Sequence, residues 1–352
     1  MATRRDRPHH LDAIFAGAVD LIVLGTRADR DVDDQQNARE LSDAAKEAVI
    51  VADVGLRWPP VRRSRRVPRG EEEKRRRILA AMSVLQGAFG LLIVLMVVTL
   101  AVRLLESQFA FFPETGETAT PSSLGVEYES LTIRSRDGER LQGWAMMHAA
   151  PRAHIVYFHG NGGNLSVWAP ILAAIALRGY GLLAFDYRGY GLSTGRPSER
   201  GLYRDVAAVI ECTAKLLPER TTVVYWGRSL GCTMAAYAAT IRAPAGLVLE
   251  SGFPSVRSLV RPTPLLAILA RFSSYRFPCS EFLRQVNVPA LVMHGDQDHV
   301  VPIARGRELF DGIAGPKRFV TIRGGDHNDL PPDAPHAYWQ AVDEFIIGLQ
   351  TH

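Results

Sequence analysis

One uncharged stretch, residues 78–102, constrains the fold of this chain more than any other feature. It is about 25 residues long, and the polar side chains in its body are Ser83, Gln86 and Thr99. A helix of about 20 apolar residues spans the hydrocarbon core of a bilayer, whereas apolar runs of about 10–14 residues are typical of buried core helices. A cleaved signal peptide has an apolar region of only about 7–15 residues. We therefore expect one transmembrane helix over residues 78–105.

Basic side chains collect directly before this stretch. The whole chain has 352 residues and a formal net charge of +4. Residues 57–77 alone hold about 10 basic and 3 acidic side chains, so the basic excess is local and does not indicate nucleic-acid binding. Because Lys and Arg collect at the cytoplasmic end of a membrane span, we expect the N-terminus in the cytoplasm and the C-terminal part on the exoplasmic or periplasmic side.

The residues before the span, 1–77, show no sustained hydrophobic periodicity apart from a short apolar patch at 14–24. We expect a basic, disordered tail there. The alternative is that translation begins at Met82. A start at Met82 would remove the basic flank, and the argument for the orientation would then lose its basis.

A regular alternation of strands and helices follows a linker at 106–125, and a single domain is expected over 126–352. Two alternating runs, 128–134 and 141–147, are separated by Asp137-Gly138, which is typical of a hairpin turn. Uninterrupted apolar strands between helices indicate a parallel sheet covered on both faces. The predicted fold is therefore α/β, with a mixed, mostly parallel sheet of about eight strands. The further strands are expected at 154–158, 180–185, 222–226, 246–249, 290–293 and 318–322, and the helices at 165–177, 203–217, 230–241, 303–310 and 337–349.

The strongest motif lies where one of these strands passes into a helix. It reads Gly227-Arg228-Ser229-Leu230-Gly231, a G-x-S-x-G nucleophile elbow in its strand–turn–helix setting. The glycines let strand and helix approach closely while the serine hydroxyl stays exposed on a strained turn. Ser229 is therefore the expected nucleophile. The Leu230 backbone N–H, at the helix N-terminus, is an expected oxyanion donor.

A carboxylate is expected at the carboxyl end of a neighbouring strand, because chemistry in such sheets collects at those ends. Two candidates follow the strand 290–293. Asp298 lies further out on the loop, towards the serine, and is the expected partner of the base. Asp296 is the alternative, although it is better placed to bond the local turn.

The general base is expected after the last strand, 318–322. His327 is the candidate that takes the Ser229 proton and later returns it to the leaving group. The order Ser, Asp, His along the chain is that of α/β-hydrolases. His336 is the weaker alternative, and His299 stands in the wrong chain order.

A second oxyanion donor is expected in the glycine-rich loop after the strand 154–158. Asn161 is the preferred candidate and Gly162 is the alternative. The glycine spacing does not fit a G-x-G-x-x-G dinucleotide loop. His159 precedes this loop and is expected to be structural. After the strand 180–185, Asp186 and Arg188 are expected to pair with each other and to brace the loops around the site.

From about Phe109 to the C-terminus, the chain resembles the α/β-hydrolase superfamily. It is most similar to the branch that pairs an N-terminal membrane helix with a compact serine hydrolase domain, which includes eukaryotic protein depalmitoylases and bacterial hydrolases of unknown substrate. The resemblance implies Ser229, Asp298 and His327 as the catalytic triad and does not fix a substrate. It rests on Phe111-Phe112-Pro113, Asp137-Gly138, His159 to Asn164, Asp186 to Gly191, Gly227 to Gly231, Gly295 to Pro302 and Asp326-His327.

An insertion of about 35 residues separates two of the strands, and a short lid is expected at about 252–286. Its apolar part, 265–269, is expected either to line an acyl pocket or to pack on the sheet. A short lid predicts an open site that admits bulky or membrane-bound esters.

The expected function is a membrane-anchored serine hydrolase that cleaves carboxylic esters or thioesters through an acyl-enzyme. Its expected partners are a small-molecule ester, a lipid ester or an acylated protein as substrate, and the bilayer around residues 78–105. No metal or organic cofactor is implied, because the triad supplies nucleophile, base and electrostatics. The alternatives are a serine peptidase of the same fold and a catalytically inactive, membrane-anchored binding module.

Overall fold

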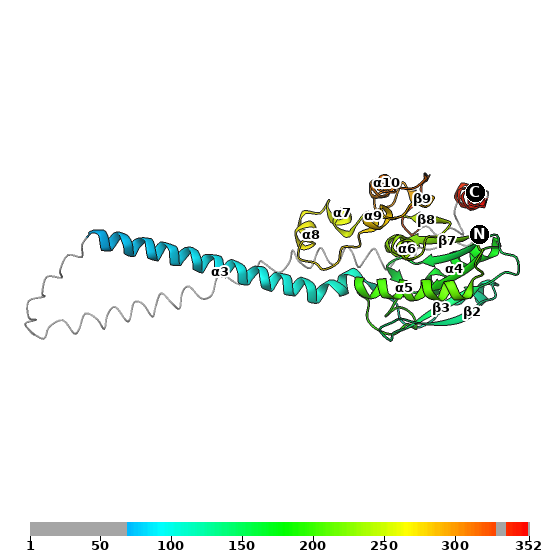
Figure 1. The fold of residues 1–352 in the computed structure, drawn as a ribbon, viewed down its shortest axis with the longest axis horizontal. Helices are drawn as coiled ribbons and strands as arrows, with labels where there is room; N and C mark the ends of the chain where they lie inside the picture. The colour runs from blue at the N-terminus through cyan, green and yellow to red at the C-terminus, as the bar shows by residue number, and fades with distance from the viewer. Residues whose placement is uncertain (1–68, 329–335, 351–352) are drawn as a thin grey trace, which may run out of the picture. The chain divides into compact units, whose positions relative to one another are not determined.

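The structure is a computed structural model, and it describes residues 69–328 and 336–350. Most of the predicted tail therefore lies outside the described residues. The chain forms two units, Met1–Leu79 and Ala80–His352. The sheet, the helices that cover it and the site belong to the second unit, whose described residues Figure 1 draws in colours from blue through cyan to red.

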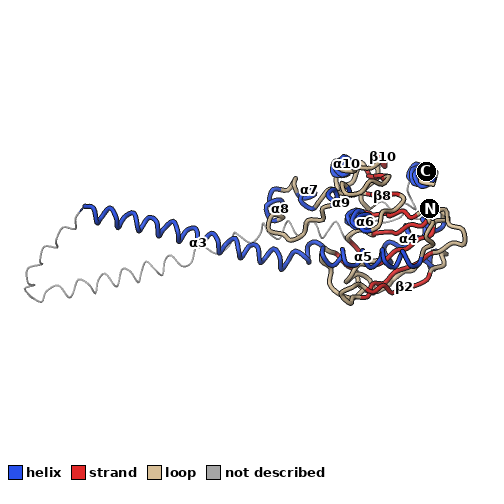
Figure 2. The backbone as a smooth tube through the Cα atoms, viewed as in Figure 1, coloured by secondary structure: helices blue, strands red, loops and turns tan. Residues whose placement is uncertain are grey.

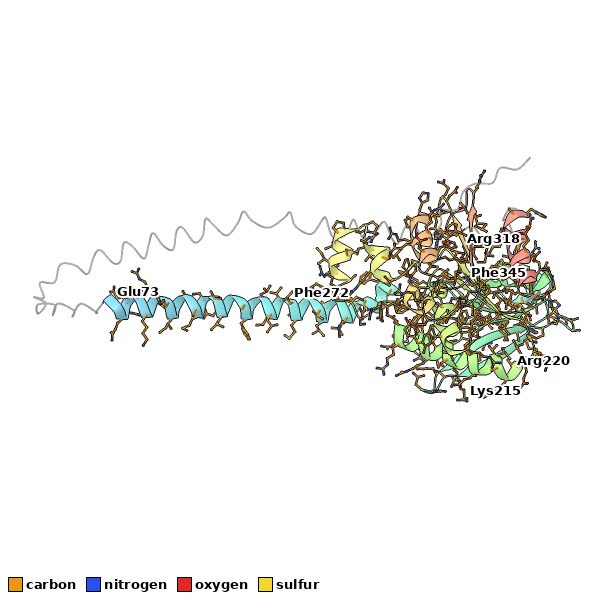
Figure 3. All side chains as sticks on the ribbon, turned by 45° about the horizontal axis from the view of Figure 1, so that its top comes forward. Glu73, Lys215, Arg220, Phe272, Arg318 and Phe345 are labelled. Atoms are coloured by element: carbon orange, nitrogen blue, oxygen red, sulfur yellow. The ribbon has the colours of Figure 1, made fainter. Side chains whose placement is uncertain are left out.

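The first described element is the helix α3 (Arg69–Ala110), which is 42 residues long. It begins before and ends after the predicted span, and so includes residues predicted as tail and as linker. By length and composition it can cross a membrane, and none of its most apolar window is buried in the structure. Its side chains project outward around the helix (Figure 3). The Thr99 hydroxyl donates to the Leu95 carbonyl at 2.7 Å, so it needs no partner outside the helix.

The structure confirms the predicted mixed, mostly parallel sheet of eight strands. Its order is β10-β9-β8-β7-β4-β6-β3-β2, and only the pairs β2·β3 and β3·β6 are antiparallel. The predicted hairpin turn joins β2 and β3. The strands are β2 (Glu129–Arg134), β3 (Arg140–Met146), β4 (His154–Phe158), β6 (Gly181–Phe185), β7 (Val223–Arg228), β8 (Gly246–Glu250), β9 (Ala290–Gly295) and β10 (Lys317–Ile322).

Helices cover both faces of the sheet, as Figure 2 shows in blue against red. One hydrophobic cluster joins Val156 and Phe158 of β4 to α5, α6, α9 and α10, and a second joins Ile155 and Tyr157 to α4 and α11. Successive residues of β4 thus enter opposite layers, as the two-residue period of a strand requires. The helices are α4 (Leu165–Leu177), α5 (Glu199–Leu216), α6 (Leu230–Ile241), α9 (Cys279–Leu283), α10 (Ile303–Asp311) and α11 (His336–Gly348), with a 3-10 turn η1 (Pro121–Leu124) before β2.

The end of α3 is joined to the sheet by a small parallel pair that the sequence did not indicate. Here β1 (Phe112–Pro113) pairs with β5 (Gly162–Gly163) in the glycine-rich loop after β4. The Phe112 N–H donates to the Asn161 carbonyl at 3.4 Å, and the Asn161 side-chain amide donates to the Ala110 carbonyl at 2.7 Å. The segment predicted as a linker therefore holds the candidate oxyanion loop directly.

The insertion between β8 and β9 contains α7 (Val256–Val260), α8 (Pro264–Leu269) and α9. The expectation that its apolar part packs on the sheet is wrong for α8, because no residue of α8 is buried. The alternative, that this part lines an acyl pocket, stays a prediction. Leu265, Leu266 and Ile268 are 54%, 45% and 55% exposed.

Candidate active site

Ser229 stands at a sharp turn between β7 and α6. It is one of the few described non-glycine residues with a positive φ, 51°. Such a conformation is strained for an L-residue and is found where the surrounding structure enforces it. The Ser229 N–H donates to the Glu250 carbonyl at 2.8 Å, which ties the turn to the end of β8. The strand–turn–helix setting is the one that the elbow motif predicts.

The two glycines of the motif are required by space. A Cβ on Gly227 would lie 2.3 Å from the Gly231 carbonyl oxygen, and one on Gly231 would lie 1.9 Å from the Phe158 carbonyl oxygen. Both distances are far below van der Waals contact, and both partners are backbone atoms that cannot move aside. The close approach of α6 to β4 and β7 therefore depends on glycine at these positions.

Asp298 and His327 are brought together by neighbouring strands. Gly295 of β9 pairs with Ile322 of β10, so the loops that follow the two strands leave the sheet side by side. The His327 Nδ1 lies 2.8 Å from the Asp298 Oδ2. With Nδ1 held by a carboxylate, Nε2 is the ring nitrogen left to accept a proton.

The environment of Asp298 keeps it ionised. Its side chain is fully buried, and its Oδ1 accepts the N–H groups of Val300 and Val301 at 3.0 and 2.7 Å. Burial alone would raise the pKa of Asp298. Hydrogen bonds from His294 and His327 outweigh burial and hold the pKa well below its usual range.

The rival residues have other surroundings. The Asp296 carboxylate accepts the Gly324 N–H at 2.7 Å, so it bonds a neighbouring turn rather than a histidine. The His299 N–H donates to the Asp326 carboxylate at 3.1 Å, and the His299 side chain is exposed. His336 opens α11 and is exposed. Of the acid and base candidates, the structure therefore pairs only Asp298 with His327 among the residues it describes.

A buried ion pair that the sequence did not indicate joins the elbow to the His327 loop. Arg228, directly before Ser229, forms an ion pair with Glu250 and also donates to the His327 carbonyl. Glu250 in turn accepts from Trp226 Nε1 at 3.3 Å and from the Tyr338 hydroxyl at 3.0 Å. Burial alone would lower the pKa of Arg228, but the Glu250 carboxylate outweighs it, so the guanidinium stays charged. In the sequence, the position of Arg228 inside the elbow motif is the only indication of this ion pair.

The candidate oxyanion donors lie beside the elbow. Phe158, the last residue of β4, pairs with Gly227 of β7, so the glycine-rich loop leaves the sheet next to Ser229. The Asn161 carbonyl accepts from the Tyr190 hydroxyl at 2.9 Å, and its side chain is bonded to α3. These bonds leave the Asn161 backbone N–H, rather than its side chain, as the group available to an oxyanion. Leu230, the first residue of α6, presents its N–H from the other side.

His159 and Asp186, which were both expected to be structural, are buried next to each other. His159 is fully buried, and burial lowers its pKa to about 4. Its Nε2 lies 3.5 Å from the Asp186 carboxylate. Burial raises the pKa of Asp186 to about 7, although the Leu165 N–H donates to it at 2.9 Å.

The expected pair between Asp186 and Arg188 is wrong. The Arg188 guanidinium contacts Asp205 at 2.7 Å and Asp137 at 2.9 Å instead. Asp137 belongs to the hairpin turn and Asp205 to α5, so Arg188 does brace loops, but through more distant carboxylates. Neither partner is adjacent in sequence, which is why the motif alone pointed to Asp186.

Comparisons with known proteins agree with the fold. A family model described as alpha/beta hydrolase fold matches residues 153–256. An uncharacterized protein of Mycobacterium tuberculosis is 34% identical over 229 residues, which cover 64% of this chain and 81% of that protein. An uncharacterized membrane protein of Saccharomyces cerevisiae is 30% identical over 243 residues, which cover 65% of this chain and 82% of that protein.

Solved structures share the fold. The esterase Pf2001 of Pyrococcus furiosus has a TM-score of 0.57 at 18% identity, over 68% of this chain and 97% of that chain. Est1E of Butyrivibrio proteoclasticus, solved with ferulic acid, has a TM-score of 0.52 at 21% identity, over 63% of this chain and 100% of that chain. At such identities these similarities speak for the fold alone.

Proposed function

Because the chain belongs to the α/β-hydrolase superfamily, we propose that it is a membrane-anchored serine hydrolase of carboxylic esters or thioesters. Ser229, His327 and Asp298 form its triad in this proposal. The observation that carries it is the pairing of Asp298 with His327 at 2.8 Å on a loop whose backbone is held by Arg228, the residue next to Ser229. Arg228 thereby ties the loop that carries His327 to the strand end that carries Ser229.

The proposed reaction has two steps. His327 Nε2 takes the Ser229 proton as Oγ attacks the acyl carbon, and the N–H groups of Leu230 and Asn161 stabilise the oxyanion. Collapse releases the alcohol or thiol, which takes the proton from His327, and leaves an acyl-enzyme. Water then attacks the acyl group with His327 again as base, and the carboxylic acid and free Ser229 are formed. Asp298 stays ionised and stabilises the imidazolium throughout.

Membrane anchoring through α3 is part of the proposal. It is supported by the length and apolar surface of the helix and by the membrane protein of yeast among the relatives. The basic side chains before the apolar stretch, within residues 57–77, support an N-terminus in the cytoplasm and a hydrolase domain on the exoplasmic or periplasmic side. In this organisation, a tail precedes α3 and the hydrolase domain, with its lid at about 252–286, follows it.

The substrate class follows from the anchor and from the short lid. A hydrolase held at a bilayer meets lipid esters and acylated proteins more often than dilute soluble esters. Of the two similar structures described above, Pf2001 is named as an esterase and Est1E was solved with ferulic acid bound. We therefore propose a lipid ester or an acylated protein as substrate, with small esters as usable surrogates.

The test uses the full chain in detergent with a fluorophosphonate probe and a nitrophenyl ester series. Labelling and hydrolysis are expected for the wild type, and Ser229→Ala should lose about 10³-fold or more of the activity and all labelling. Ser123→Ala, in the exposed turn η1, is the matched serine control and should behave like the wild type. If the probe labelled Ser229→Ala as strongly as the wild type, or did not label the wild type, the inactive binding module would be the remaining alternative. Cleavage of peptide anilides in preference to esters would identify a peptidase instead.

A further inference from the structure

The insertion carries an exposed tip that the proposed chemistry does not use. The tip comprises residues 256–271, with α7 and α8. Two backbone hydrogen bonds close its base. The Val256 N–H donates to the Arg276 carbonyl at 3.0 Å, and the Ser280 N–H donates to the Pro254 carbonyl at 3.2 Å. The Glu199 carboxylate of α5 accepts the N–H groups of Arg276 and Phe277 at 2.6 and 2.7 Å. The tip therefore projects from a fixed base.

The outer surface of the tip is apolar. Leu265, Leu266 and Ile268 are about half exposed, and no other residue of α8 is buried either. Leu265 and Ile268 are three residues apart and lie on one side of the helix. Grouped exposed aliphatic side chains on an otherwise polar surface mark sites of interaction.

Positive charge surrounds these aliphatic side chains. No Asp or Glu occurs between residues 251 and 280, whereas this segment contains four arginines. Arg276 pairs with Glu281 at 3.0 Å. Arg257, Arg261 and Arg271 are exposed, and no carboxylate of the described residues forms an ion pair with them. Such a surface complements an anionic one, because each exposed arginine adds to the attraction towards anionic lipid.

The segment that follows the tip, residues 273–275, is attached to the end of α3. The Glu106 carboxylate accepts from the Ser273 hydroxyl at 2.6 Å and from the Ser274 N–H at 2.8 Å. The Phe111 ring packs edge-on against Tyr275 with centroids 5.3 Å apart. The apolar stretch ends at residue 102, so Glu106 lies only about 6 Å further along the helix axis. Phe272, labelled in Figure 3, stands between the tip and these contacts.

We infer that the tip is a second membrane-binding surface, which lies on anionic lipid where α3 leaves the bilayer. Leu265, Leu266 and Ile268 enter the boundary between headgroups and acyl chains, and Arg257, Arg261 and Arg271 bind lipid phosphates. The inference rests on the proposed insertion of α3 and goes beyond it. It means that the lid, and hence the approach to Ser229, is in contact with the bilayer from which a lipid substrate would come.

The test places an environment-sensitive fluorophore at single introduced cysteines in the full chain. The chain is reconstituted in vesicles of phosphatidylcholine with phosphatidylglycerol. Lipids spin-labelled near the headgroup serve as quencher for the tip and its control, and lipids spin-labelled at the end of the acyl chain serve as quencher for α3. Leu265→Cys reports the tip, Leu92→Cys reports α3, and Leu177→Cys is the control. Leu177 is an exposed leucine at the end of α4, outside the insertion, and is 68% exposed. The unsubstituted chain measures labelling of the native cysteines.

The label at Leu265→Cys should be quenched about twofold more than the label at Leu177→Cys, and this difference should shrink when Arg261 and Arg271 are both changed to Glu. Quenching at Leu92→Cys with none at Leu265→Cys would overturn the inference and leave the anchor intact. Absence of quenching at both sites would overturn the anchor as well. A signal at Leu265→Cys that vanishes when the protein is diluted to about one copy per vesicle would identify a second copy as the occupant, and would also overturn the inference.

Discussion

The helix α3 and the strand β4 are both built from apolar residues, yet their surroundings are opposite. Every residue of β4 is buried, whereas nothing in the most apolar window of α3 is. Burial of apolar surface contributes about 25 cal/mol per Å², and β4 obtains it from two packed layers of side chains. For α3 the described residues offer no such layer, and in the proposed organisation lipid takes its surface out of water. In that proposal, one chain contains apolar segments suited to two different surroundings, a protein core and a bilayer.

This difference indicates where the structures of α3 and of the domain around the sheet depend on each other. Along most of α3 a substitution meets no neighbour, whereas in the sheet it meets several. The dependence is confined to the short segment from Glu106 to Pro113, where α3 contacts the insertion and the glycine-rich loop. Substitutions in the two regions should therefore have separate effects, except in that segment.

The largest contrast is expected between two glycines changed to alanine. Gly231→Ala places a Cβ 1.9 Å from the Phe158 carbonyl oxygen and should cost more than about 3 kcal/mol, with loss of probe labelling. Gly87→Ala, in α3, meets nothing within 4 Å and replaces a poor helix former, so the hydrolase domain should unfold as in the wild type. Denaturant unfolding of the full chain in detergent measures both. Similar losses from the two variants would show that the two regions are not separate.

The next prediction tests whether α3 requires lipid around it. Leu92→Arg puts a charge within the apolar stretch, and an arginine near the centre of a span costs about 3 kcal/mol on insertion. The amount of protein retained in membranes after alkaline extraction should fall, while the unfolding temperature in detergent should not change. Leu92→Ala, which adds no charge, is the control and should be retained. A lower unfolding temperature for Leu92→Arg would mean that α3 packs against the domain, contrary to the comparison.

A smaller effect is expected from the pH dependence of stability. The pKa of Asp298 is lower in the folded than in the unfolded chain, so its contribution is present above about pH 4 and is lost as the pH falls towards the folded pKa. Asp298→Asn lacks this contribution, of the order of 2 kcal/mol. The difference in unfolding free energy between Asp298→Asn and the wild type should therefore be largest above pH 4 and should shrink on acidification.

The matched control is Asp296→Asn. Asp296 lies two residues earlier on the same loop but is exposed and bonds only the turn at Gly324. Its pH profile should follow that of the wild type. A profile for Asp298→Asn that runs parallel to the wild type down to pH 2 would contradict the buried, ionised state of Asp298.

Features fixed by local sequence could be predicted. The eight strands and the helices that cover them follow from hydrophobic periodicity, and two helices begin and end at the predicted residues. The elbow can be recognised in the sequence because the close approach of α6 to β4 and β7 requires glycine at positions 227 and 231. The pairing of Asp298 with His327 was open at the level of sequence, because Asp296 and His336 occur nearby, and only the strand register separates them.

Features fixed by distant contacts could not be predicted. Arg228 is paired with Glu250 because β7 lies beside β8, and Arg188 finds Asp205 and Asp137 rather than Asp186. The pairing of Phe112 with Gly162 likewise joins a segment that has no strand pattern of its own. An ion pair or a two-residue strand leaves no periodic signal, since its partner is chosen by the fold.

The smallest effect should appear where the two regions meet. Glu106→Gln removes the charge that accepts hydrogen bonds from Ser273 and Ser274, and should weaken the contact by about 1 kcal/mol. Amide hydrogen exchange at Ser274 should then be about fivefold faster, because 1.4 kcal/mol corresponds to a factor of ten. Glu73→Gln, which disrupts an exposed pair with Arg77 at the other end of α3, should leave that exchange unchanged. Because the effect of Glu106→Gln depends on the contact and that of Glu73→Gln does not, equal exchange in the two variants would mean that α3 and the insertion are joined by chain connectivity alone.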